Sequence, residues 1–146
     1  MTTKSRATVR ITWHFKASPE SMFDAWTDPN LAWTWMARAA GQIVCIEIDP
    51  RVHGAVRQVV RRDGHEVEYV GEYVELARPT RLAFTWPAPP FSDDRSLVKL
   101  DFRPVGTGTD LTLAQERVQQ GRESRTMDGW RAILDAISVG LARRNS

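Results

Sequence analysis

The stretch that decides the fold is Ser124–Arg143, SRTMDGWRAILDAISVGLAR. Its large apolar residues recur every three or four positions, which places their side chains on one face of an α-helix. They are Met127, Trp130, Leu134, Ile137 and Leu141. Burying five such side chains, at about 1.5–3 kcal/mol each, stabilises a protein by roughly 10 kcal/mol. One helix cannot keep this face dry, so the rest of the chain must cover it.

Both ends of this helix carry suitable residues. Ser124 can cap the first turn, and Arg143 suits the negative end of the helix dipole. No proline interrupts the run. The pattern therefore predicts one long helix at the end of the chain.

The composition is that of an ordinary globular protein. The chain has 146 residues, of which 42% are hydrophobic and 26% are charged. This length suits one domain with a substantial core and is short for two, so we expect a single domain over residues 1–146. The net charge of +2, without a run of basic residues, gives no indication of a nucleic-acid partner. No apolar run has membrane-spanning length and no secretory signal is present, which predicts a cytoplasmic protein.

Neither cysteine nor histidine chemistry is indicated. The one cysteine, Cys45, excludes an internal disulfide and a cysteine-based metal cluster. Its apolar neighbours favour a buried, inert thiol, with a nucleophile as the alternative. His14, His53 and His65 lack the spacing of metal ligands, and the first is expected on an outer face. We predict no metal and no other cofactor.

The first third of the chain predicts one strand followed by two short helices. Residues 9–15 alternate apolar and polar side chains, as in a half-buried strand. Ser18-Pro19 opens a helix, Asp28-Pro29 ends it, and Asp28 can cap a second short helix that ends before Gly41. That second helix would carry Leu31, Trp33, Trp35 and Met36.

Six further strands are predicted before the long helix. The alternating runs lie near residues 44–48, 56–61, 66–76, 82–86, 97–102 and 111–113. In the first run, Val44, Ile46 and Ile48 alternate with polar or small neighbours. Asp63-Gly64 is a strong signal for a tight hairpin. Short connections imply a curved antiparallel sheet, whose apolar face needs the long helix as a partner.

Three groups of residues, in this order, resemble a known family. The first is Phe23-Asp24-Ala25-Trp26-Thr27-Asp28-Pro29, followed by Leu31 and two tryptophans. The second comprises Gly54, Asp63-Gly64, Gly71-Glu72-Tyr73, Arg78-Pro79-Thr80-Arg81-Leu82 and Phe84-Thr85-Trp86. The third comprises Gly108-Thr109-Asp110-Leu111-Thr112-Leu113 and Gly129-Trp130. Over about residues 8–141, the chain resembles the family homologous to the carboxy-terminal domain of the activator of the ninety-kilodalton heat-shock-protein ATPase. That family belongs to the START-like superfamily, also called SRPBCC or birch-pollen-allergen-like.

The resemblance implies an α+β helix-grip fold. Its parts would be a seven-stranded curved antiparallel sheet wrapped around the long C-terminal helix, with two short helices between the first two strands. It also implies a cavity between sheet and helix that often holds an apolar small molecule. The family often has Gly-Gly where this chain has His53-Gly54, and Trp-Trp where it has Trp33-Thr34-Trp35. Both departures would lie at the mouth of the cavity.

Large aromatic residues are the candidate walls of such a cavity, and a few polar groups would orient the ligand. The wall candidates are Trp33, Trp35, Tyr69, Trp86, Met127, Trp130 and Ile133, and the polar candidates are Tyr73 and His53. The alternative is that the tryptophans simply fill the core.

Two sets of charged residues are expected on the outer side of the sheet. Alternation places Glu66, Glu68 and Glu72 together on a solvated face, which argues against paired acid–base chemistry. Arg57 and Arg61 could bind a ligand carboxylate if they pointed inward. Alternation with the neighbouring valines instead places them outside.

Three functions follow, in order of preference. The first is a non-enzymatic protein that encloses an apolar or amphipathic small molecule. The second is a stress-response, co-chaperone-like module that contacts a chaperone ATPase, and the third is an enzyme of the cyclase, hydrolase or aromatase kind. No Ser-His-Asp arrangement or other catalytic signature is readable, so an enzyme ranks last. The sequence leaves open whether the protein is a monomer or a homodimer.

Overall fold

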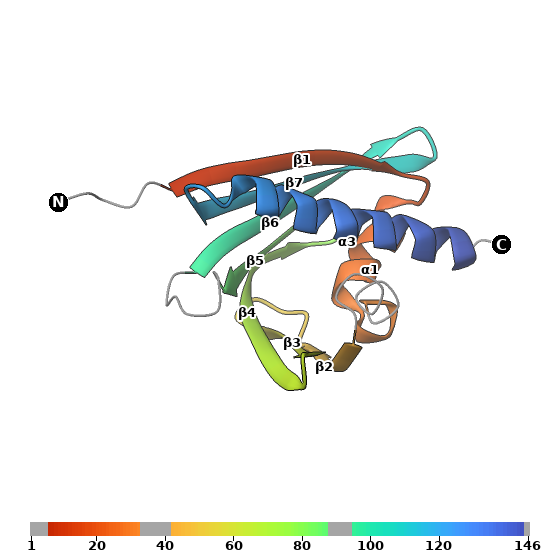
Figure 1. Ribbon diagram of the computed structural model, residues 1–146. Helices are drawn as coiled ribbons and strands as arrows, with labels where there is room; N and C mark the ends of the chain where they lie inside the picture. The colour runs from red at the N-terminus through yellow and green to blue at the C-terminus, as the bar shows by residue number, and fades with distance from the viewer. Residues whose placement is uncertain (1–5, 33–41, 88–94, 145–146) are drawn as a thin grey trace.

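The computed structural model describes residues 6–32, 42–87 and 95–144, which form nine labelled elements and one partly described helical segment (Figure 1). Strand β1 (Arg6–Phe15) is followed by helix α1 (Pro19–Thr27) and by a second helical segment at residues 29–32. Six strands come next, β2 (Gln42–Ile48), β3 (Ala55–Arg62), β4 (His65–Ala77), β5 (Arg81–Pro87), β6 (Arg95–Val105) and β7 (Gly108–Gln119). Helix α3 (Glu123–Arg144) closes the described chain.

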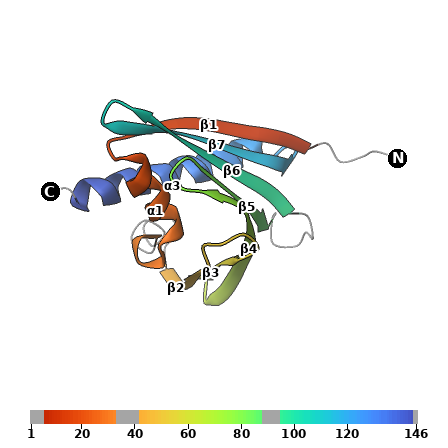
Figure 2. The same cartoon turned by 180° about the vertical axis from the view of Figure 1, so that it is seen from behind.

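The seven strands form one antiparallel sheet in the order β1-β7-β6-β5-β4-β3-β2. Strands β2 to β7 follow one another as a meander, and β1 joins the sheet beside β7. The sheet is curved, α3 packs along one face over β1 and β7, and α1 packs against β6 and β7 (Figures 1 and 2). This is the α+β helix-grip fold that the sequence predicts, with short helical segments between the first two strands. Within the described part of the chain, neither helix combines the length and the apolar character needed to cross a membrane.

The predicted caps of the short helices are confirmed. The Ser18 hydroxyl accepts a hydrogen bond from the Ser21 backbone N–H at 3.2 Å, with Pro19 in the first turn. The Asp28 carboxylate accepts one from the Asn30 backbone N–H at 2.9 Å, where the second helical segment begins. The cap predicted for the long helix is wrong. Helix α3 begins one residue earlier, at Glu123, whose carboxylate accepts a hydrogen bond from the Gly121 backbone N–H.

Helix α1 is joined to the turn between β4 and β5 by one ion pair. The guanidinium of Arg78 donates from Nε and Nη2 to the two carboxylate oxygens of Asp24, both at 3.0 Å. Such a two-point contact fixes direction as well as distance. It therefore positions α1 relative to the middle of the sheet.

The hairpin between β3 and β4 is as tight as its sequence indicates. Asp63 and Gly64 both have positive φ angles, 52° and 78°, as a two-residue turn requires. Arg62 pairs directly with His65, so β3 ends one residue later than the sequence predicts. As a result, Arg62 belongs to the strand and continues its alternation.

The face of the sheet toward α3, called the inner face below, is buried more completely on β6 and β7 than on β2 to β4. On β6 and β7, Val98, Leu100, Leu111 and Leu113 are all 0% exposed. Together with buried residues of α1 and α3, they form the core. On β2 to β4, by contrast, the inner-face side chains of Ile43, Ile46, Gln58, Val67 and Tyr69 are only half-buried. Val56, Val60 and Tyr73 on these strands are buried. The inner face is thus less completely covered on β2 to β4 than on β6 and β7.

A bulge in β2 changes which of its residues face inward. The pairing shifts between Ile43, opposite Val60, and Cys45, opposite Val59, which leaves Val44 unpaired and 38% exposed. Alternation with Ile46 and Ile48 would place Val44 on the inner face, and the bulge shows this to be wrong. The buried thiol predicted for Cys45 from its apolar neighbours is also wrong. One extra residue in a strand reverses the alternation that precedes it. Cys45 is half-buried on the outer face instead.

Candidate functional site

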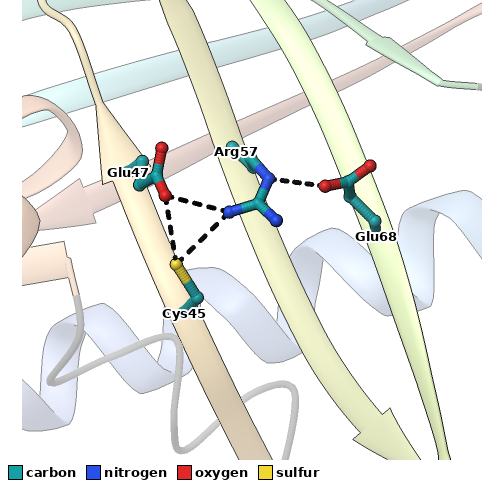
Figure 3. Close-up of polar contacts among 4 residues, drawn as sticks. All are labelled: Cys45, Glu47, Arg57 and Glu68. Carbon is teal, nitrogen blue, oxygen red and sulfur yellow. Dashed lines mark hydrogen bonds and ion pairs between the residues drawn. The ribbon is translucent and has the colours of Figure 1, made fainter.

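The outer face of the sheet carries a network of ion pairs centred on Arg57. Its guanidinium donates to Glu47 at 2.9 Å and to Glu68 at 2.5 Å, and Nη1 lies 3.4 Å from the Cys45 sulfur (Figure 3). The hydrogen bond that Arg57 donates to the Glu68 carboxylate raises the pKa of Arg57 above its usual value. The four residues come from the adjacent strands β2, β3 and β4, and the guanidinium lies between two carboxylates. The predicted outward position of Arg57 is confirmed.

The remaining carboxylates of β4 are paired in the same way. Glu66 lies 3.3 Å from Arg61, Glu75 lies 3.2 Å from Arg81, and Glu72 lies 3.1 Å from His53. A second bulge, between Tyr73 and Glu75, keeps Glu75 on the outer face with the others. These side chains are largely exposed, as the sequence predicts for a solvated row of carboxylates.

The structure places His53 apart from the other candidate residues. It lies in the turn between β2 and β3, with a φ of 71° and a side chain that is 81% exposed. Its imidazole contacts Glu72 on the outer side of the sheet. His14 also lies on the outer face as predicted, 2.7 Å from Asp110. In the part of the chain that the structure describes, no three His, Cys, Asp or Glu side chains are grouped as a metal ion would require.

Four aromatic residues of β4 and β5 meet on the inner face and are called the aromatic group below. The rings of Tyr69 and Trp86 stack at 5.9 Å and 10°, and Phe84 stands nearly perpendicular to Trp86 at 6.0 Å. Tyr73 meets Phe84 edge-on at 6.3 Å. The structure therefore brings three predicted wall and anchor residues, Tyr69, Tyr73 and Trp86, into one continuous surface.

Gly71 makes this arrangement possible. It lies between the two tyrosines on β4, where a Cβ atom would meet the Thr85 carbonyl oxygen at 2.0 Å and the Trp86 ring at 3.2 Å. Only a residue without a side chain allows β5 to approach this closely.

Helix α3 supplies three more predicted residues. Trp130 is 9% exposed and belongs to the core, whereas Met127 and Ile133 are half-buried against it. The Trp130 indole donates to the Gln115 side chain at 2.6 Å, and Gln115 donates to the Ser96 hydroxyl at 2.7 Å. Ser96 in turn donates to the backbone carbonyl of Trp86 at 3.1 Å. Trp33 and Trp35 lie outside the described residues.

A second set of polar groups on the inner face has no such network. Tyr73 is 1% exposed, and the half-buried Gln58 lies opposite Tyr69 in the β3–β4 pair. No hydrogen bond joins the Tyr73 hydroxyl or the Gln58 amide to any other described residue. Burial raises the pKa of Tyr73 well above its usual value, and the Asp49 carboxylate adds to this effect. The phenol therefore remains protonated at neutral pH and is available as a hydrogen-bond donor.

Arg62 lies at the edge of this surface. It shares strand parity with Val56, Gln58 and Val60, and its guanidinium carbon lies 6.0 Å from the centre of the Tyr69 ring. Among the described residues no carboxylate forms an ion pair with it. The sequence prediction missed Arg62 because it assigned this residue to the turn. The alternation of Val56 and Val60 is the signal that could have found it.

The sequence prediction also did not name Gln58, Ser96 and Gln115 as polar residues of the inner face. Gln58 follows the same alternation as Arg62, so its inward position was readable from β3. Ser96 and Gln115 acquire their roles through the pairing of distant strands, and no local pattern marks them.

Comparisons with known proteins agree with this fold. The family model described as activator of Hsp90 ATPase homolog 1-like protein matches residues 16–142. A solved protein from Chromobacterium violaceum is 24% identical with a TM-score of 0.78, and the match covers 90% of this chain and 94% of that one. A putative uncharacterized protein from Rhizobium leguminosarum is 24% identical with a TM-score of 0.81 and 97% of each chain covered. An HSP90 activator from Plasmodium falciparum is 24% identical with a TM-score of 0.74, covering 92% of this chain and 96% of that one. No curated protein sequence matches significantly.

Proposed function

The chain belongs to the family of activator of Hsp90 ATPase homolog 1-like proteins, and from this premise we propose that it binds an apolar or amphipathic small molecule. The molecule would lie between α3 and the inner face of β3, β4 and β5. Binding would be driven by the removal of apolar surface from water and oriented by a few hydrogen bonds.

The observation that carries this proposal is the half-buried part of the inner face. Tyr69, Val67 and Gln58 are only half-buried. On β6 and β7 of the same sheet, by contrast, the inner-face residues Val98, Leu100, Leu111 and Leu113 are fully buried. Stacked aromatic rings next to polar groups that have no described partner provide both a flat wall and points of orientation.

Each residue has a distinct part in this proposal. Tyr69 and Trp86 would form an aromatic wall, Met127 and Ile133 would line the opposite side from α3, and the Tyr73 hydroxyl would donate a hydrogen bond. Trp130 contributes its ring only, because Gln115 already occupies its N–H. Trp33 and Trp35 remain predicted wall residues. The exposed His53 is not part of this site.

Thermal unfolding against fatty acids, sterols, flavonoids and polyketides tests the proposal. A ligand at a hundred times its dissociation constant adds about 2.7 kcal/mol, or roughly 5–10 °C for a chain of this size. We expect one chemical class to raise Tm by this amount and Tyr69→Ala to remove most of the shift. Val74→Ala is the matched control, because Val74 is an exposed bulge residue of the same strand. A panel without any shift, or an equal shift in both variants, would contradict the proposal.

A second candidate is a co-chaperone-like module that contacts a chaperone ATPase. The family description and the similar fold of the Plasmodium falciparum HSP90 activator favour it. In this case the charged outer face around Arg57 is the natural contact surface. Adding the protein to a purified Hsp90-type chaperone should then increase ATP hydrolysis, and an unchanged rate at saturating protein would reject this candidate.

A further inference from the structure

We propose that the ligand of the inner face is an organic anion, a molecule with a flat aromatic body and an acidic group that pairs with Arg62. This inference rests on the function proposed above and specifies the chemical class of the ligand. The flat body would lie against Tyr69 and Trp86, and the acidic group would point toward the hairpin between β3 and β4.

The first argument is the position of Arg62. It is the last residue of β3 and follows Val56, Gln58 and Val60 on the inner face, so its side chain starts on the same side of the sheet as the aromatic group. The guanidinium then lies over the Tyr69 ring, at 6.0 Å from its centre. This distance permits a cation–π contact, which holds the cation beside the aromatic wall.

The second argument is the contrast between Arg62 and the other arginines of the same strand. Arg57 pairs with two glutamates and Arg61 pairs with Glu66, all on the outer face. Within the described ranges, Arg62 forms no ion pair with a carboxylate. Its planar group, which can bind a carboxylate or sulfonate through two parallel hydrogen bonds, therefore keeps its donors for another partner.

The third argument is that apolar and charged surfaces are adjacent here. The Tyr69 ring contacts both the Arg62 guanidinium and the Trp86 indole, which is nearly parallel to it. A ligand that covers the stacked rings would reach the cation with a short acidic substituent. Neutral apolar molecules would gain the ring contacts only, so the site should prefer the acid.

Two fluorescent probes with the same ring system test this preference. Anilinonaphthalene sulfonate carries one negative charge, and phenylnaphthylamine lacks it. We expect wild-type protein to bind both and Arg62→Gln to bind the sulfonate about tenfold more weakly, as for the loss of a hydrogen bond to a charged group. Binding of phenylnaphthylamine should not change. Arg61→Gln removes the neighbouring outer-face charge and should leave the affinity for both probes unchanged.

The controls separate this inference from the proposed function. Equal sulfonate affinity in wild type and Arg62→Gln, or an equal loss in Arg61→Gln, would overturn the pairing with Arg62. Binding of both probes without any preference for the sulfonate would overturn it too, while the proposed function would stand. Failure of wild-type protein to bind either probe would contradict the proposed function itself. Circular dichroism checks the fold, and Arg62→Lys, which keeps the charge without the planar group, should lose only part of the affinity.

Discussion

Two glycines in regular elements have opposite surroundings. A Cβ atom on Gly71 would lie 2.0 Å from the Thr85 carbonyl oxygen, whereas one on Gly129, in α3, would meet nothing within 4 Å. We therefore expect Gly71→Ala to lower the free energy of unfolding by about 1–3 kcal/mol through overpacking. Gly129→Ala should raise it by about 0.5–1 kcal/mol through the better helix propensity of alanine. Denaturant unfolding of both variants measures the free energy of unfolding. Changes of the same sign would show that the room for a Cβ atom does not decide the effect of alanine at these two positions.

The titration of Tyr73 should change stability only at high pH. Burial raises its folded pKa above the ordinary value of about 10, so the unfolded chain loses this proton first. The contribution of the protonated Tyr73 to the free energy of unfolding is fully present at pH values below the ordinary pKa. It is lost as the pH rises through the pKa that Tyr73 has in the folded protein. Tyr69→Phe leaves Tyr73 as the sole tyrosine, since the sequence has two.

In that variant, we expect the phenolate absorption band to appear well above pH 10 and together with loss of circular dichroism. Tyr73→Phe should unfold at a higher pH than wild type. A phenolate signal near pH 10 in a folded protein would contradict the buried position.

The sequence predicted residues well where strand alternation is regular. Arg57, Glu68 and His14 lie on the outer face as expected. Alternation failed for Val44, because a bulge is one extra residue that no hydrophobic pattern marks. The buried thiol predicted for Cys45 came from its apolar neighbours, whereas its alternation with Ile46 and Ile48 agrees with the outer position. Alternation also left Arg62 unassigned, because a strand and its hairpin turn share the same polar residues at their boundary.

At the scale of elements, a chain of side-chain hydrogen bonds joins α3 to the sheet. Gln115 of β7 accepts from Trp130 and donates to Ser96 of β6. Gln115→Leu should lower the free energy of unfolding by about 1–3 kcal/mol, because the buried indole N–H loses its partner. The matched control is Gln119→Leu at the exposed end of the same strand, which should stay within about 0.5 kcal/mol of wild type.

A double-mutant cycle with Trp130→Phe isolates this contact. Once the indole N–H is absent, replacing Gln115 should cost less than it does in wild type. Additive costs would mean that the two side chains do not cooperate in holding α3.

The order and type of the helices and strands could be predicted from the sequence, because apolar side chains recur about every 3.6 residues in α3 and every 2 residues in the strands. Turn signals such as Asp63-Gly64 fixed which strands are neighbours. The partners of Ser96 and Gln115 were not readable, because they depend on the register of strands that lie far apart in the sequence. Most of the fold, and the aromatic part of the candidate site, could therefore be predicted, whereas the hydrogen-bonded pair Ser96 and Gln115 could not.

At the scale of the whole molecule, the gradient in burial should be a gradient in local stability. Strands β6 and β7 are covered by α1 and α3. The inner side chains of β2 are half-buried, and β3 carries the half-buried Gln58 and the exposed Arg62 between and beyond its buried Val56 and Val60. Regions with less buried apolar surface open at a lower free-energy cost. We expect backbone amides of β2 and β3 to exchange hydrogen faster than those of β6 and β7, as measured by mass spectrometry. Uniform exchange would contradict this gradient, and a bound ligand should slow exchange mainly in β3 to β5.

The ion pair between Asp24 and Arg78 has a consequence for inheritance. Two stretches of the family resemblance, Phe23–Pro29 and Arg78–Leu82, are joined by this ion pair, whose two residues lie 54 positions apart in the sequence. Natural selection can therefore act on them as a single unit. Recombinants that take α1 from one relative and the β4–β5 turn from another should retain a well-positioned helix only when both parents carry the same pair of charges. Among diverging relatives, the acid and the arginine are expected to be exchanged or lost together.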